Sequence, residues 1–120
     1  MSDTNSKSAP EATGNCYEAA LNYMMDHRDE LHLRLVHAEV VGQGPIEGLH
    51  IGHAWVEDGG WVIDTSNGRN IRMPKWQYYA IGKVLEVNNI HRYTYAQAAE
   101  TCLEFGHYGP WVESLLNTAM

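Results

Sequence analysis

Three residues of the types used in nucleophilic catalysis lie in the first part of the chain: Cys16, His53 and Asp64. A thiol, an imidazole and a carboxylate in one site can act as nucleophile, general base and the acid that orients the base. Such a site would serve a hydrolase or acyltransferase that works through a covalent acyl-enzyme. Whether the three residues meet depends on the elements that carry them.

Cys16 lies at the start of a predicted helix that runs to about Asp29. Apolar residues recur there with the helical period, at Tyr17, Ala20, Leu21, Met24 and Met25. Asn15 and Glu18 fit a capping box, which places Cys16 at the first helical position. The free N–H groups and the helix dipole at that position favour a thiolate and could also stabilise an oxyanion. The alternative for Cys16 is a small structural residue at a helix start.

His53 and Asp64 lie in two β-like runs, IGHAWVE and GWVIDTS, which flank a turn at residues 58–59. Asp-Gly between such runs predicts a two-residue type I′ loop. His53 then pairs directly with Asp64, with Cβ atoms about 5 Å apart. The carboxylate would accept the Nδ1–H of His53 and leave Nε2 for the thiol. A loop at residues 59–60 would instead oppose Trp55 to Asp64 and leave His53 diagonal on the same face.

Each member of this pair has a structural alternative. His53 could be a hydrogen-bonded histidine in a half-buried strand, and Asp64 could cap the turn formed by the TSNG segment that follows it. However, an acid inside the apolar run WVID is costly unless it interacts with the histidine on the same face. The two residues together therefore favour a shared site.

The segments GNCYEAA, GHAWVE and GGWVIDTS, in this order, resemble the transglutaminase-like branch of the papain-like cysteine enzymes. The resemblance covers about Gly14 to Ser66. It implies a papain-like core in which Cys16, His53 and Asp64 form a catalytic triad. It further implies a peptidase, amidase or acyltransferase that acts on a protein, peptide or other amide substrate.

Two positions depart from the pattern of that superfamily. Pro10 stands where papain-like enzymes have a Gln before the cysteine, and Thr65 follows the acid in place of the usual proline. The first departure leaves the second oxyanion donor unidentified, with the Asn15 side chain as a weak candidate. Asn15, Tyr17 and Trp55 are the predicted residues of a substrate cleft, and core packing is the alternative for Tyr17 and Trp55.

The remaining patterns predict one α+β domain over residues 13–120, in which the Cys-bearing helix packs on a small, mostly antiparallel sheet. Residues 1–12 are polar and are predicted to form a disordered tail. The other expected elements are a strand over Leu33–Val41, a short helix from Pro74 to about Ile81, a strand over about Val84–Tyr93, a helix capped by Thr94 and Gln97 and ended by Gly106, and a short helix after Gly109-Pro110. The loop GQGPIEG lacks a phosphate-binding pattern and could flank the cleft.

Composition narrows the possible partners. The net charge is −7 and the eight basic residues are scattered, which disfavours nucleic acid and anionic membranes as partners. No stretch approaches the roughly 18 apolar residues of a membrane span. The absence of an apolar N-terminal run and the presence of only two cysteines favour a reducing cytoplasm. The oligomeric state stays open.

Two further functions compete with catalysis. Cys16, His53 and Asp64 could hold zinc with His50 or His91 as a fourth ligand, but no CxxC or HExxH motif supports a metal site. The prediction is therefore of a protein without metal or cofactor. The short chain and the missing oxyanion donor also fit an interaction module that keeps the fold without catalysis.

Overall fold

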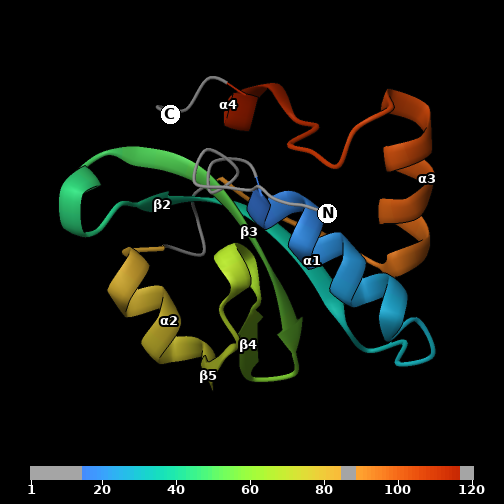
Figure 1. Cartoon of the computed structure of the whole chain (residues 1–120), viewed down its shortest axis with the longest axis horizontal. Helices are drawn as coiled ribbons and strands as arrows, with labels where there is room; N and C mark the ends of the chain where they lie inside the picture. Colours follow the sequence, from blue (N-terminus) through green and yellow to red (C-terminus); the bar gives the residue numbers. More distant parts are fainter. Residues whose placement is uncertain (1–14, 85–88, 117–120) are drawn as a thin grey trace, which may run out of the picture.

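The computed structural model describes residues 15–84 and 89–116, which form an α+β fold around a five-stranded antiparallel sheet (Figure 1). The strand order is β5-β4-β3-β2-β6. The strands are β2 (Arg34–Val41), β3 (His50–Asp58), β4 (Trp61–Asp64), β5 (Ile71–Pro74) and β6 (Ile90–Tyr93). The helices are α1 (Asn15–Asp26), α2 (Lys75–Gly82), α3 (Tyr95–Phe105) and α4 (Glu113–Leu116), with short 3-10 turns η2 (Gly44–Ile46) and η3 (Ser66–Gly68). The predicted α+β class and antiparallel sheet are confirmed.

Helices cover both faces of the sheet, and each face has its own apolar cluster (Figure 1). Successive residues of a strand point to opposite faces, so β2 and β3 contribute to both clusters. On the α1 and α3 side the cluster includes Leu21, Leu35, Val56, Ile63 and Ala98. On the α2 side it includes Val36, Trp55, Val62 and Tyr79. The first cluster fixes the helix that bears Cys16 against the sheet.

The ends of several elements differ from the prediction. α1 stops at Asp26, because the buried apolar face ends with Met24 and the following segment is charged and exposed. β5 was not predicted, because the run Ile71–Pro74 contains a proline, which a strand tolerates only at a sheet edge. β5 is such an edge strand. Part of the predicted strand before β6 falls on residues 85–88, outside the described residues, as does the predicted tail.

Helix α3 begins and ends where its sequence signals predict. The Thr94 side chain accepts a hydrogen bond from the Gln97 backbone, and the Gln97 side chain accepts one from the Thr94 backbone. This is the predicted capping box. Gly106 ends α3 in the left-handed conformation, with φ of 77°.

The hairpin between β3 and β4 turns at Gly59-Gly60, so the predicted Asp58-Gly59 turn is wrong. Asp58 pairs with Trp61 as the last rung of the ladder. Of the two loop residues only Gly59 has a positive φ, which matches a type II′ turn rather than type I′. The Asp58 carboxylate is engaged on the strand by His32 at 2.8 Å and Arg72 at 3.4 Å, which favours Asp58 as a strand residue.

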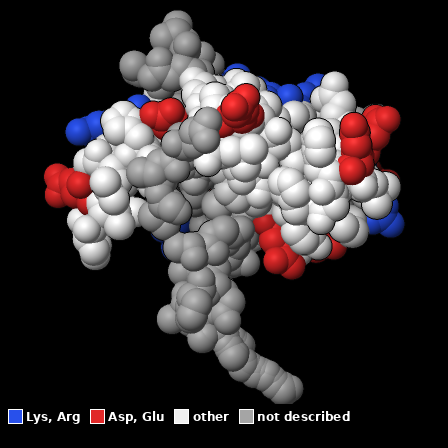
Figure 2. Space-filling model, turned by 90° about the horizontal axis from the view of Figure 1, so that it is seen from above, with Lys and Arg blue, Asp and Glu red and all other residues white. Residues whose placement is uncertain are grey.

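The described surface has no concentrated basic patch in the view of Figure 2, where Lys and Arg side chains lie toward the edges. Acidic side chains are spread over the same view. Within residues 15–84 and 89–116, no helix has the length and apolar character needed to cross a bilayer.

His37 is a fully buried polar residue in β2. The rings of Tyr17, Tyr93 and Trp111 surround it, with centroids 4.8 to 5.2 Å away. Neither ring nitrogen has a hydrogen-bond partner within the described part of the chain. Burial, assisted by nearby His91, lowers the pKa of His37 to about 3. The side chain is therefore neutral in the folded protein at neutral pH.

This burial predicts an acid-sensitive fold. Between pH values of about 6.5 and about 3 the unfolded chain binds a proton on His37 that the folded chain does not bind. The free energy of unfolding should therefore fall by up to about 1.4 kcal/mol per pH unit as pH decreases through this window. His37→Leu should remove this part of the pH dependence. Urea unfolding of both proteins at several pH values tests it, and equal pH slopes would contradict it.

Candidate functional site

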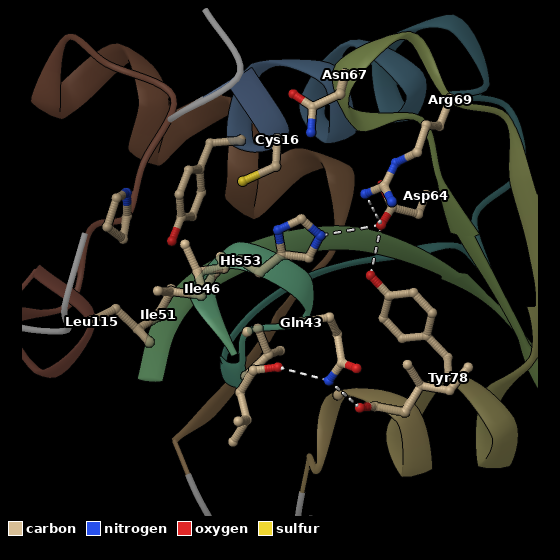
Figure 3. Close-up of a pocket in the computed structure, with 18 of the residues that line it drawn as sticks. Cys16, Gln43, Ile46, Ile51, His53, Asp64, Asn67, Arg69, Tyr78 and Leu115 are labelled. Atoms are coloured by element: carbon tan, nitrogen blue, oxygen red, sulfur yellow. Dashed lines mark hydrogen bonds and ion pairs between the residues drawn. The ribbon is translucent and has the colours of Figure 1, made fainter. Parts of the chain in front are cut away.

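The site forms where β3 extends past the end of β4. β3 has nine residues and β4 only four. In the register of this pair, Trp55 lies opposite Asp64, the last residue of β4. His53 lies two positions further along β3, past the end of β4. α1 contacts both β3 and η3 at this end of the sheet. The Thr65 hydroxyl donates to the Ala19 carbonyl at 3.5 Å, which ties the segment after β4 to α1. Cys16, near the start of α1, thereby reaches the side of His53 (Figure 3).

The structure brings the three predicted residues together. His53 Nε2 lies 3.1 Å from Asp64 Oδ2. On the other side of the ring, the Cys16 sulfur points toward the imidazole, as Figure 3 shows. Cys16 is a buried free thiol, and the side chains of His53 and Asp64 are 16% and 1% exposed. The imidazole thus lies between the thiol and the carboxylate.

The predicted roles of the two ring nitrogens are reversed. With the loop at residues 59–60, His53 and Asp64 form a diagonal pair, and the direct pairing is wrong. Diagonal partners are about 7–8 Å apart at the backbone, so the imidazole extends toward Asp64 with its distal nitrogen, Nε2. Nδ1 is left for Cys16. The shared face of His53 and Asp64 does not depend on the register and is as predicted.

Asp64 performs both of the roles considered from the sequence, with different oxygens. Oδ1 accepts from the Ser66 backbone at 2.9 Å and the Ser66 hydroxyl at 2.6 Å, which caps the turn. Oδ2 accepts from the Tyr78 hydroxyl at 2.7 Å and contacts His53. Arg69 Nη2 lies 3.5 Å from the same oxygen. These contacts fix the carboxylate, with Oδ1 on the turn and Oδ2 shared by His53, Tyr78 and Arg69.

His53 and Asp64 each stabilise the charged form of the other. Burial lowers the pKa of His53, but the hydrogen bond to Asp64, the adjacent Cys16 thiol and the Asp64 charge outweigh burial and raise the pKa to about 9. Burial raises the pKa of Asp64, but His53, Ser66 and Tyr78 outweigh it and lower the pKa well below its ordinary value. Burial and the Asp64 carboxylate raise the pKa of Tyr78, so Tyr78 stays a neutral donor. Near pH 7 the site therefore holds an imidazolium beside an ionised Asp64.

Asp64→Asn removes the negative charge that keeps His53 protonated. If the pKa of His53 falls from about 9 to 6.5 or below, its protonated fraction at pH 7.5 drops at least about tenfold. We expect this loss of protonation in the folded variant at pH 7.5. An NMR titration of His53 checks the pKa directly. Asp58→Asn, in the same hairpin, is the matched control, and an unchanged His53 titration in Asp64→Asn would contradict the assignment.

The start of α1 differs slightly from the prediction. The helix begins at Asn15, so Cys16 is its second residue rather than its first. It remains in the first turn, where backbone N–H groups have no partner inside the helix. The Asn15 side chain is not described, so its predicted roles in capping and in the cleft stay predictions.

Asn67 is a site residue that the sequence did not reveal as one. It lies in η3 with φ of 57° and ψ of 32°, a left-handed conformation that asparagine tolerates better than most residues. Its side chain lines the same pocket as Cys16 and lies between Cys16 and Arg69 in Figure 3. Its amide is a hydrogen-bond donor on the Cys16 side of the site.

The two aromatic cleft candidates have different positions. Tyr17 is largely buried and contributes to the pocket wall while packing edge-on against His37. Trp55 is fully buried in the core, so it does not wall the cleft as predicted. Its indole donates to Glu57 at 3.1 Å, and its ring packs 5.0 Å from that of Tyr78. Trp55 therefore packs against Tyr78, the residue that donates to Asp64, and does not line the pocket itself.

The three residues open into a pocket of about 750 Å³. Gly42, Gln43, Pro45 and Ile46 form part of its wall, so the loop between β2 and β3 flanks the cleft. The volume lies within the range of small-molecule sites.

The proposed fourth zinc ligands are engaged elsewhere. His50 Nδ1 lies 2.7 Å from Glu39 Oε2, and His91 Nε2 lies 2.8 Å from Asn89 Oδ1. Within the described ranges, the one cluster with the spacing of a metal site is Glu30, His32 and Asp58, which includes none of the three site residues.

Comparisons of the chain with protein families, curated proteins and solved structures found no match. The resemblance to transglutaminase-like enzymes therefore stays a prediction, and the functional argument depends on the geometry of the site.

Proposed function

We propose that the protein is a cysteine hydrolase or acyltransferase of the transglutaminase-like type, which forms an acyl-enzyme on Cys16. The observation that carries the proposal is the position of His53 between the Cys16 thiol and the Asp64 carboxylate, at the wall of a pocket. A charged histidine beside a thiol favours the thiolate, which is the nucleophilic form.

In the first step the Cys16 thiolate attacks the substrate carbonyl and forms a sulfur–carbon bond. The bond from that carbon to the leaving group breaks, and the leaving group takes the proton of the His53 imidazolium. In the second step neutral His53 accepts a proton from water, or from an acceptor amine, as it attacks the thioester. The carboxylic acid or transferred product leaves, and thiolate and imidazolium are restored. Asp64 stays ionised and orients the ring throughout.

The oxyanion of each tetrahedral intermediate requires donors near the sulfur. The free N–H groups in the first turn of α1 supply one side. We propose the Asn67 amide as the second donor, because it lines the pocket on the Cys16 side of the site. Asn67 would then be the second oxyanion donor, the role that a Gln before the cysteine has in papain-like enzymes and that Pro10 cannot fill.

Two observations favour catalysis over an interaction module that keeps the fold. The Cys16 sulfur points toward the His53 imidazole, and both residues line a pocket. A purely structural site requires neither an accessible pocket nor a thiol beside an imidazolium.

The proposal predicts that p-nitrophenyl acetate acetylates Cys16 and is then turned over. Intact-mass and peptide mass spectrometry after rapid quenching should locate one acetyl group on Cys16. Cys16→Ser should lose both the adduct and turnover, whereas Cys102→Ser, which alters the second free thiol on α3, should retain them. Equal acetylation of the two cysteines, or turnover that survives Cys16→Ser, would contradict the proposal.

A further inference from the structure

The pocket beside Cys16 has a polar part and an apolar part. Asp64 and Arg69 lie on one side of His53, and Asn67 lies between Cys16 and Arg69. The aliphatic side chains Ile46 and Ile51 lie on the opposite side of the ring in Figure 3. Further aliphatic lining comes from Val40, Ile81 and Leu115.

The strand pattern and the loop explain why the apolar part adjoins the nucleophile. Ile51 lies two residues before His53 on β3, so both point to the same face, and Val40 of β2 is paired with Ile51. Ile46 comes from the loop between these strands. A Cβ at Gly42 would collide with the Ile46 carbonyl, so this close packing of the loop requires glycine.

Hydrogen bonds hold this loop against its neighbours. The Gly42 N–H donates to the Leu49 carbonyl at 2.7 Å. The Gln43 side chain donates to the Ile81 carbonyl of α2 at 2.9 Å. The aliphatic wall is therefore built on a tethered loop and on the sheet.

The charges near the pocket are already engaged. Arg69 donates to the Ser66 hydroxyl at 3.0 Å and contacts Asp64 at 3.5 Å, while Asp64 faces His53. A charged acyl group placed among Val40, Ile46 and Ile51 would lose its hydration without gaining an ionic partner, which is costly. An aliphatic group there would be stabilised by burial.

We infer that the site accepts thioesters, esters or amides whose acyl side is an uncharged aliphatic chain. The inference rests on the proposed function and names its substrate class. The acyl carbon binds the Cys16 sulfur while its chain occupies the aliphatic part of the pocket. Water then releases the chain as a carboxylic acid, with His53 accepting the water proton.

A series of p-nitrophenyl esters tests the inference. From acetate to butyrate to hexanoate, kcat/KM should rise about fourfold for each added methylene that the pocket buries. The hexanoyl ester stands for substrates with a fatty-acyl group. An N-acetyl-leucine ester stands for peptide substrates with an aliphatic side chain. A higher rate than acetate on either supports the inference, and equal rates on all esters overturn it.

Substitutions in the pocket wall test whether the aliphatic part of the pocket causes the preference for longer esters. Ile46→Asp should abolish the advantage of the longer esters over acetate, because it places a carboxylate in the aliphatic part of the pocket. Leu49→Asp is the matched control, because Leu49 is an exposed residue of the same loop outside the pocket lining. Ile81→Asp, at the exposed end of α2, is a second variant that does not depend on the loop.

The outcomes separate this inference from the proposed function. Cys16-dependent acetate hydrolysis without a chain-length preference overturns the inference and leaves the proposed function standing. A preference that persists in both Ile46→Asp and Ile81→Asp overturns the assignment to this pocket. Absence of any Cys16 acylation by every ester overturns the proposed function, and the inference with it.

Discussion

Replacing His53 by Ala is expected to lower the rate of Cys16 acylation by p-nitrophenyl acetate about 10²–10⁴-fold. The variant removes the imidazolium that stabilises the Cys16 thiolate and the proton that the leaving group requires. Stopped-flow measurement of p-nitrophenolate release under single-turnover conditions gives this rate. Added imidazole in solution should restore part of it, because the cavity left by the side chain adjoins the pocket.

His50→Ala is the matched control for this experiment. His50 lies on the same strand, is exposed, and pairs with Glu39 rather than with Cys16. Its removal should change the acylation rate by less than about twofold, as expected for a surface residue outside the site. Similar losses in the two variants, or a fully active His53→Ala, would contradict the assigned base.

Replacing Asn67 by Gly is expected to lower the acylation rate about 10²–10³-fold, the usual effect of removing one oxyanion donor. Glycine is the appropriate replacement because Asn67 has a φ of 57°, which alanine would adopt only with strain. The variant therefore removes the amide while it keeps the backbone conformation. The same single-turnover assay measures the effect.

Alkylation distinguishes a donor from a residue that only positions Cys16. Iodoacetamide reacts by displacement of iodide and forms no oxyanion, so its rate at Cys16 should be the same in Asn67→Gly and wild type. Asn70→Gly, in the same exposed segment but outside the pocket lining, is the control for loop effects. Equal losses of acylation and alkylation in Asn67→Gly would contradict the proposed oxyanion role.

The sequence predicted which strands carry the site but not how they align. The period of two along a strand places His53 and Asp64 on one face in either register, so this prediction did not require the correct turn. The turn itself was misassigned because Asp58 pairs with His32 and Arg72, which are far from it in sequence. A local Asp-Gly signal contains no information about such contacts.

The residues that complete the site are brought in by tertiary structure. Tyr78 reaches Asp64 from α2, and the two residues are fourteen positions apart. Asn67 and Arg69 lie in the segment after β4, where composition alone indicates only a turn. Trp55 shares the parity of His53 but is covered by α2, so its burial could not be read from strand alternation. Strand alternation predicts the face of the sheet on which a side chain lies. Whether that side chain is buried or lines the pocket depends on which helices and loops pack on that face.

The most direct test of the account is the rate of iodoacetamide alkylation at Cys16 from pH 6 to pH 9, with N-acetylcysteine as a reference thiol. In wild type, Cys16 should react far faster than the reference at pH 6, because the His53 imidazolium beside the sulfur stabilises the reactive thiolate. In His53→Ala this advantage should disappear. Parallel pH profiles for Cys16 and the reference, unaffected by His53→Ala, would contradict a catalytic Cys16–His53–Asp64 site.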